Sequence, residues 1–138
     1  MACPFPKAAV DKGDYTITLD HERCLVYVVA QGEFDFQSGG ELSTDARKTA
    51  AEHQCNIVCD VRKSRAKVNL ADWFFLPRRL FVYKDWKTRS VKTAILVTAG
   101  KQESNYRFFE NVTSNLGLWI KIFLSEEKAL EWLRVAPK

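Results

Sequence analysis

The sequence lacks the short motifs by which many enzymes are recognised. It contains no GxxxxGK[ST] phosphate-binding loop, no GxGxxG fingerprint, no HExxH zinc motif and no GxSxG nucleophile elbow. Only two histidines are present, His21 and His53, and we expect structural or surface roles for both because a catalytic histidine needs an oriented neighbour. We therefore expect a protein that is not an enzyme and uses no cofactor. The alternative is a small hydrolase or transferase that uses Asp60 with His53.

Cysteine is also scarce, and its spacing does not match a metal site or a disulfide framework. The four cysteines are Cys3, Cys24, Cys55 and Cys59; they form no CxxC pair, and no histidine stands at zinc-site spacing from a cysteine pair. Cys55 and Cys59 share one face of a predicted strand, about four residues apart, which is too far for an easy disulfide. We expect buried free thiols, as is typical of a reducing cytosol.

Long hydrophobic runs are missing as well. No apolar stretch approaches the ~20 residues of a membrane span, and the first residues lack the charged and apolar regions of a signal peptide. We expect a soluble, cytoplasmic protein of bacterial type. Its 138 residues, 46% of them hydrophobic, suffice for one domain with a packed core and are too few for two comfortable ones.

Acidic residues are rare in the middle of the chain. Ten basic and two acidic residues lie between Val61 and Lys92, so this segment carries +8 and the remainder −4, for a net charge of +4. The chain is therefore electrically polarised about its middle. A net charge of +4 is modest, and we expect no nucleic-acid partner.

The hydrophobic pattern predicts five strands and about four helices in the order β-β-α-β-α-β-α-β-α. The strands are expected at 15–19, 25–30, 55–61, 93–97 and 119–123. The helices are expected at about 36–53, 70–84, 104–116 and 126–133. The first two strands should form an antiparallel hairpin, and the later ones should be largely parallel. This order predicts an α/β fold with a mixed five-stranded sheet, formed by one domain over 14–134 after a loose lead-in over 1–13.

Local signals refine the helices. Asp35, Asn69 and Ser125 are candidate N-caps, and Asp72 stands three residues after Asn69. Two glycines at 39–40 weaken the first helix, so its firm start is expected at 40 or 43.

Other signals mark helix ends and loops. Proline disrupts a helix interior, so Pro77 predicts a kink or two short helices, the second running from 77 to about 84. Gly117 stands where a C-terminal cap glycine belongs. Segments 62–67 and 86–89 are predicted as basic loops, and Gly32 as the end of the second strand.

The strand that ends in Asp60, the strand TAILV at 93–97 and the tail IKIFLSEEKALEWL at 120–133 resemble the SpoIIAA-like branch of the STAS superfamily. These proteins are relatives of bacterial anti-sigma-factor antagonists, and the resemblance covers roughly 14–134. It implies a single STAS-type domain, a mixed sheet with helices packed across it. Antagonists of the sporulation type carry a phosphorylatable serine at the helix after the central strand. No serine stands at 68–72 here, and Ser64 does not match that position, so the phosphorylation switch is not carried over.

Two groups of residues remain as a candidate binding site, because ligands of open α/β sheets bind beyond the carboxyl ends of strands. One group is basic and surrounds the predicted loop after the third strand; the other is the bulky run before Pro77, whose four members cannot all face inward on one helix. The candidate site residues are Arg62, Lys63, Arg65, Lys67, Trp73, Phe74, Phe75, Arg78 and Arg79. The plain alternatives are a solvated basic face and a fully buried apolar run.

These residues support two functional hypotheses. The first is a regulatory binding module that docks a protein partner, as the resemblance implies, with exposed parts of the run 73–76 as anchors. The second is a binder of a small anionic ligand, such as a nucleotide or a lipid headgroup, which the resemblance also permits. Arginines of the basic face would then hold the phosphate. The oligomeric state stays open, with a homodimer among the alternatives.

Overall fold

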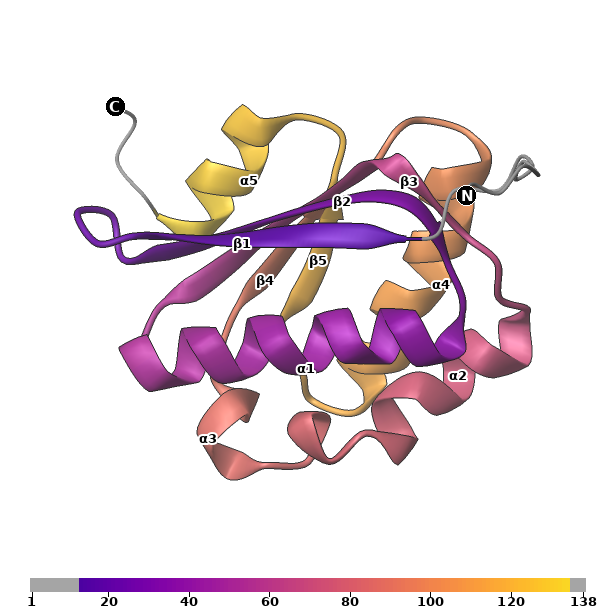
Figure 1. The fold of residues 1–138 in the computed structure, drawn as a ribbon, viewed down its shortest axis with the longest axis horizontal. Helices are drawn as coiled ribbons and strands as arrows, with labels where there is room; N and C mark the ends of the chain where they lie inside the picture. Colours follow the sequence, from indigo (N-terminus) through magenta and orange to yellow (C-terminus); the bar gives the residue numbers. More distant parts are fainter. Residues whose placement is uncertain (1–12, 135–138) are drawn as a thin grey trace, which may run out of the picture.

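The protein is described over residues 13–134 by a computed structural model (Figure 1). Its strands are β1 (Asp14–Asp20), β2 (Leu25–Phe34), β3 (Asn56–Ala66), β4 (Thr93–Leu96) and β5 (Ile120–Phe123). Its α-helices are α1 (Phe36–His53), α2 (Leu70–Arg79), α3 (Trp86–Arg89), α4 (Lys101–Asn115) and α5 (Glu126–Leu133), and a 3-10 helix, η2, spans Phe81–Tyr83. The predicted lead-in, apart from Gly13, and the predicted free thiol of Cys3 lie outside the described residues.

The five strands form one mixed sheet in the order β1-β2-β3-β4-β5. β1 and β2 are antiparallel, whereas β2, β3, β4 and β5 run parallel to one another. Tight turns favour antiparallel neighbours, while the later connections contain helices, as parallel crossovers require. The predicted α/β class, the hairpin and the five strands are confirmed.

Helices cover both faces of the sheet (Figure 1). α1, α2 and α4 lie on one face, where Val28, Ile57 and Ile95 form part of the larger core. α5 lies on the opposite face, where its Ala129 and Leu133 pack in a smaller core that also holds Val58, Leu96 and Leu25. Because side chains alternate along a strand, β3 and β4 bury both faces, which explains their nearly continuous apolar sequences.

The predicted basic loop 62–67 is wrong, because most of it belongs to β3. Segment 62–66 continues the strand and pairs with β2, which itself runs past Gly32 to Phe34. β4 pairs with β3 only as far as Asp60, so this extension has strand neighbours on one side alone and its charged side chains reach solvent. Gly32 has a φ of 86°, and the register between β2 and β3 shifts just before it, between Val29 and Gln31. A glycine tolerates this conformation, so it marks an irregularity and not an end.

α1 begins at Phe36, earlier than the predicted firm start at 40 or 43. Asp35 accepts a hydrogen bond from the Ser38 amide, and the Ser38 hydroxyl accepts one from the Asp35 amide. This reciprocal cap offsets the weak helix propensity of the glycines. Gly40 has a further role, because a Cβ at this position would lie 3.4 Å from the side chain of Leu80.

The region after β3 differs from the prediction in three places. α2 continues through Pro77 to Arg79, and only a 3-10 turn follows, so no second α-helix starts at the proline. The helix ends two residues beyond Pro77, so the missing amide disturbs only its last turn. Segment 86–89, predicted as a loop, is the short helix α3, capped by Asp85. α4 starts at Lys101 and not at 104, and Gly117 follows its end with a φ of 79°, as a C-terminal cap glycine does.

Asn69 is confirmed as the N-cap of α2. Its side chain accepts a hydrogen bond from the Asp72 amide at 2.8 Å, and the Asp72 carboxylate accepts one from the Asn69 amide. We expect Asn69→Ala to lower the free energy of unfolding by about 1 kcal/mol, and Asn69→Gly by only a few tenths. Urea denaturation of the three proteins checks this. Equal stability of Asn69→Ala and the wild type would show that the cap contributes nothing.

The cysteines of the described residues are free: Cys55 and Cys59 are buried, as predicted, whereas Cys24 is exposed. No helix between residues 13 and 134 is both long enough and apolar enough to span a bilayer.

Candidate functional site

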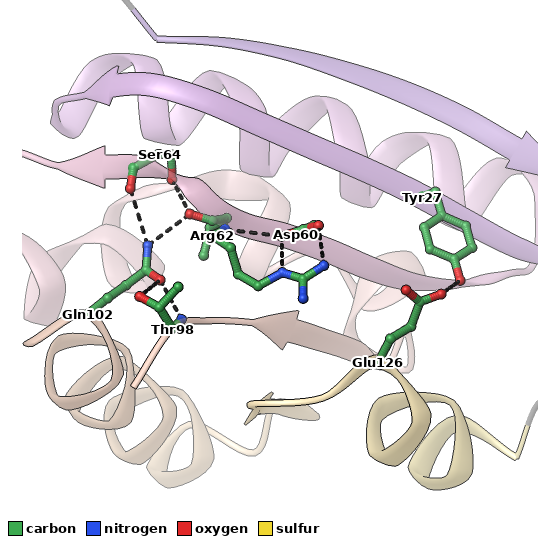
Figure 2. Close-up of polar contacts among 8 residues, drawn as sticks. Tyr27, Asp60, Arg62, Ser64, Thr98, Gln102 and Glu126 are labelled. Atoms are coloured by element: carbon green, nitrogen blue, oxygen red, sulfur yellow. Dashed lines mark hydrogen bonds and ion pairs between the residues drawn. The ribbon is translucent and has the colours of Figure 1, made fainter. Parts of the chain in front are cut away.

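The basic residues of the candidate site do not converge on one point. Arg62 donates two hydrogen bonds to the Asp60 carboxylate, each 2.9 Å long, and these bonds lower the pKa of Asp60 (Figure 2). The positive charge of Arg62 is therefore already compensated. Lys63, Arg65 and Lys67 are exposed along the extension of β3 and just beyond it.

Gln102, near the start of α4, closes the carboxyl end of the parallel strands (Figure 2). Its side-chain nitrogen donates to the carbonyls of Val61 and Ser64 at 2.8 and 3.2 Å, and its oxygen accepts from the Thr98 amide at 2.7 Å. The side-chain amide of Gln102 thus occupies the region beyond the strand ends where open α/β sheets usually bind ligands. Nothing in the sequence pointed to this residue beyond its being a polar side chain after a strand.

The outer face of α2 carries two exposed aromatic rings, each covered by an arginine. Phe74 and Phe75 are 39% and 38% exposed and meet edge to face, with ring centroids 5.3 Å apart. The guanidinium of Arg78 lies 3.7 Å from the centre of the Phe74 ring, and that of Arg79 lies 4.6 Å from the centre of the Phe75 ring. We call these four residues the aromatic–arginine surface.

The inner face of α2 is part of the core, so Trp73 is not an exposed anchor for a protein partner. Trp73 is 6% exposed, and its ring packs against Tyr106 and Phe109 of α4 at centroid distances of 4.8 and 5.4 Å. Leu76 is buried on the same face. Helical periodicity divides the run 73–76 into two buried and two exposed side chains, so the expectation that not all four face inward is confirmed.

A cavity of about 100 Å³ lies between the sheet and helices α1, α2 and α4. Most of its wall is apolar, and α2 contributes Asp72, Trp73 and Leu76. Cys59 lines it as well, and burial raises the pKa of this thiol to about 12. None of the six basic residues of the candidate site lines this cavity, so the cavity and the basic face are separate features.

Asp60 and His53, the pair considered for acid–base chemistry, each have another partner. Asp60 is bonded to Arg62, whereas the Nδ1 of His53 lies 3.0 Å from the Thr49 carbonyl. The rings of His53 and His21 meet edge to face with centroids 6.2 Å apart, a contact that the sequence did not indicate. Between residues 13 and 134, no three His, Cys, Asp or Glu side chains are placed to hold a metal ion.

A mixed five-stranded sheet with helices on both faces and an N-terminal antiparallel hairpin defines the class of fold. One solved structure shares it: an uncharacterized protein of the DUF3478 family, with a SpoIIAA-like fold, from Shewanella loihica. The two chains superpose with a TM-score of 0.52 at 14% sequence identity, over 94% of this chain and 99% of the other. The protein therefore has a SpoIIAA-like fold, as its sequence predicts. No protein-family model matches the chain, and no curated protein does either.

Proposed function

We propose that the protein is a regulatory, non-enzymatic binding module that docks a protein partner on the aromatic–arginine surface of α2. The observation that carries this proposal is the exposure of two phenylalanines that meet edge to face, each with an arginine against its ring. Aromatic rings and arginines are the residues enriched at energetic hot spots of protein interfaces. A SpoIIAA-like fold is compatible with this role, although it does not select it.

Charge defines the kind of partner. The segment from Val61 to Lys92 carries +8, and two of its cations, Arg78 and Arg79, belong to the aromatic–arginine surface itself. A complementary partner would present acidic side chains around an apolar centre, since like charges across an interface cost several kcal/mol. Exposed Leu70 stands one helical turn before Phe74 on α2, so it extends the apolar part of the surface. We therefore infer an acidic, amphipathic protein segment as the partner.

The test compares capture of a partner by matched variants. Phe74→Ala combined with Phe75→Ala should weaken binding at least tenfold, because truncating central aromatic anchors typically costs more than about 1.4 kcal/mol. Trp119→Ala combined with Leu124→Ala is the control, since these side chains are also exposed but belong to the segment around β5. The protein that the wild type recovers from a lysate of the source organism is identified, purified and titrated against each variant by calorimetry.

Salt and charge reversal provide a second measurement on the same pair. Arg78→Glu combined with Arg79→Glu should slow association and remove most of its salt dependence, because steering by charge acts mainly on the association rate. Equal affinity of the folded Phe74/Phe75 variant and the wild type would refute docking on this surface. Equal losses in the Phe74/Phe75 variant and the Trp119/Leu124 variant would show nonspecific adhesion instead.

A further inference from the structure

A second unusual feature of the molecule is a buried arginine, Arg47 of α1. This arginine is 2% exposed, which is rare for a residue with a permanent positive charge. Its Nη1 donates to the Thr93 hydroxyl at 3.2 Å, and its Nη2 donates to the Thr88 carbonyl at 2.6 Å. The guanidinium also lies 4.9 Å from the centre of the Tyr83 ring. All three partners are neutral, so nothing among them compensates the charge.

The third guanidinium nitrogen of Arg47 has no hydrogen-bond partner among residues 13–134. The Nε atom is fully buried and makes no hydrogen bond. A buried, unsatisfied donor costs about 1–3 kcal/mol, and more when the group is charged. Burying a cation without an anion costs several kcal/mol in addition, and burial accordingly lowers the pKa of Arg47. This arrangement needs an acceptor that the described residues do not supply.

Arg47 lines the cavity between the sheet and α1, α2 and α4, and so do its neighbours Tyr83 and Thr93. Its guanidinium contacts both of these lining residues, through the hydrogen bond to Thr93 and the face of the Tyr83 ring. The only carboxylates among the lining residues are Asp35 and Asp72, and both are bonded to amides at helix N-termini. The cavity thus combines an apolar wall with one cation that has no anionic partner.

We propose that this cavity binds a small aliphatic monocarboxylate, whose carboxylate accepts the Nε–H of Arg47 and whose tail lies among the apolar side chains. A carboxylate supplies both the missing acceptor and the missing negative charge, and hydrogen bonds between ions are the strongest of their kind. The volume limits the tail: a cavity of about 150 Å³ holds a benzene ring. About 100 Å³ is smaller, so only a short aliphatic chain fits.

The experiment is an NMR titration of the full chain, labelled with ¹⁵N, with sodium butyrate. The buried Nε–H of Arg47 is the direct reporter, and its signal is expected to move and saturate. The neutral analogue butan-1-ol has a tail of the same length, and we expect it to bind at least tenfold more weakly. Sodium chloride at equal concentration controls for ionic strength. The titration extends to about 500 mM, ten times the dissociation constant of about 50 mM that six atoms contributing about 0.3 kcal/mol each would give.

Arg47→Met separates the charge from the shape of the site. This variant should lose at least tenfold in butyrate affinity while its affinity for butan-1-ol is unchanged or higher. If the variant does not fold, the comparison of butyrate with butan-1-ol on the wild type decides alone. Equal affinity for the two compounds would overturn the proposal in favour of a purely apolar cavity. An Arg47 signal that does not move up to the same concentration would also overturn it. Neither outcome affects docking on the outer face of α2, which is measured separately.

Discussion

Trp73→Ala is expected to lower the free energy of unfolding by about 3–5 kcal/mol, the typical cost of removing a buried tryptophan. Trp73 is 6% exposed and joins α2 to α4 through its ring contacts with Tyr106 and Phe109. It also lines the existing cavity, so truncation enlarges a space that the surrounding backbone cannot easily fill. The loss is comparable with the whole stability of a marginal domain.

The matched control is Phe74→Ala on the next position of the same helix. Phe74 is 39% exposed and its main contacts are Phe75 and the guanidinium of Arg78, so its truncation should cost no more than about 1 kcal/mol. Urea denaturation measures both, with unchanged slopes required for a valid comparison. A cost for Trp73→Ala as small as that for Phe74→Ala would mean that α2 does not pack on the sheet as described. The pair also separates folding from docking, because only Phe74 belongs to the aromatic–arginine surface.

Elements with strong periodic patterns could be predicted from the sequence. The alternation in 15–19, the apolar runs at 55–61 and 93–97, and the caps at Asp35, Asn69 and Ser125 all correspond to structure. These features depend on neighbours along the chain, so local rules suffice for them. The strand extension over 62–66 could not be predicted, since pairing with β2 overrides the basic composition that suggested a loop.

The candidate site was predicted only in part for the same reason. A single sequence places Trp73, Phe74 and Phe75 together, but only packing against α4 decides which rings are inside. Arg47 was missed entirely, because an arginine beside the buried stripe of a helix is normally solvated. What buries it is the carbonyl of Thr88 and the ring of Tyr83, about forty residues later in the chain. Such long-range contacts leave no local pattern.

The protein is expected to lose stability steeply above pH 9, because buried acids keep their protons in the folded state. Burial raises the pKa of the Cys59 thiol from an ordinary value of 9.0 to about 12. It also raises that of the Tyr83 hydroxyl above its ordinary value of 10.0. The unfolded chain therefore releases these protons at lower pH than the folded protein. Stability depends on this difference in bound protons, so it is complete below pH 9 and falls as the pH rises.

Between its pKa in the unfolded chain and its pKa in the folded protein, each buried group lowers the free energy of unfolding by about 1.4 kcal/mol per pH unit. This pH range is the window of the group. For Cys59 the window opens near pH 9.0 and closes near pH 12, which amounts to roughly 4 kcal/mol. The Tyr83 window opens near pH 10.0, so the slope should steepen there. Cys55, whose pKa burial and the neighbouring Cys24 raise to about 11, adds to the lower part of the range. Since the whole stability of a domain is about 5–15 kcal/mol, we expect cooperative alkaline unfolding.

Two variants measure how much Cys59 and Tyr83 each contribute to the fall of stability with pH, and each variant serves as the control for the other. Cys59→Ala should reduce the loss between pH 9 and pH 10 by about 1 kcal/mol, although it also costs some stability at neutral pH through the cavity it creates. Tyr83→Phe removes only a hydroxyl, and it should leave that interval unchanged but flatten the slope above pH 10. Urea denaturation at half-unit steps of pH gives the free energies. A Cys59→Ala slope that parallels the wild type from pH 9 to pH 10 would mean that the thiol is reached by water in the folded state, and that the core around β3 opens more readily than its burial implies.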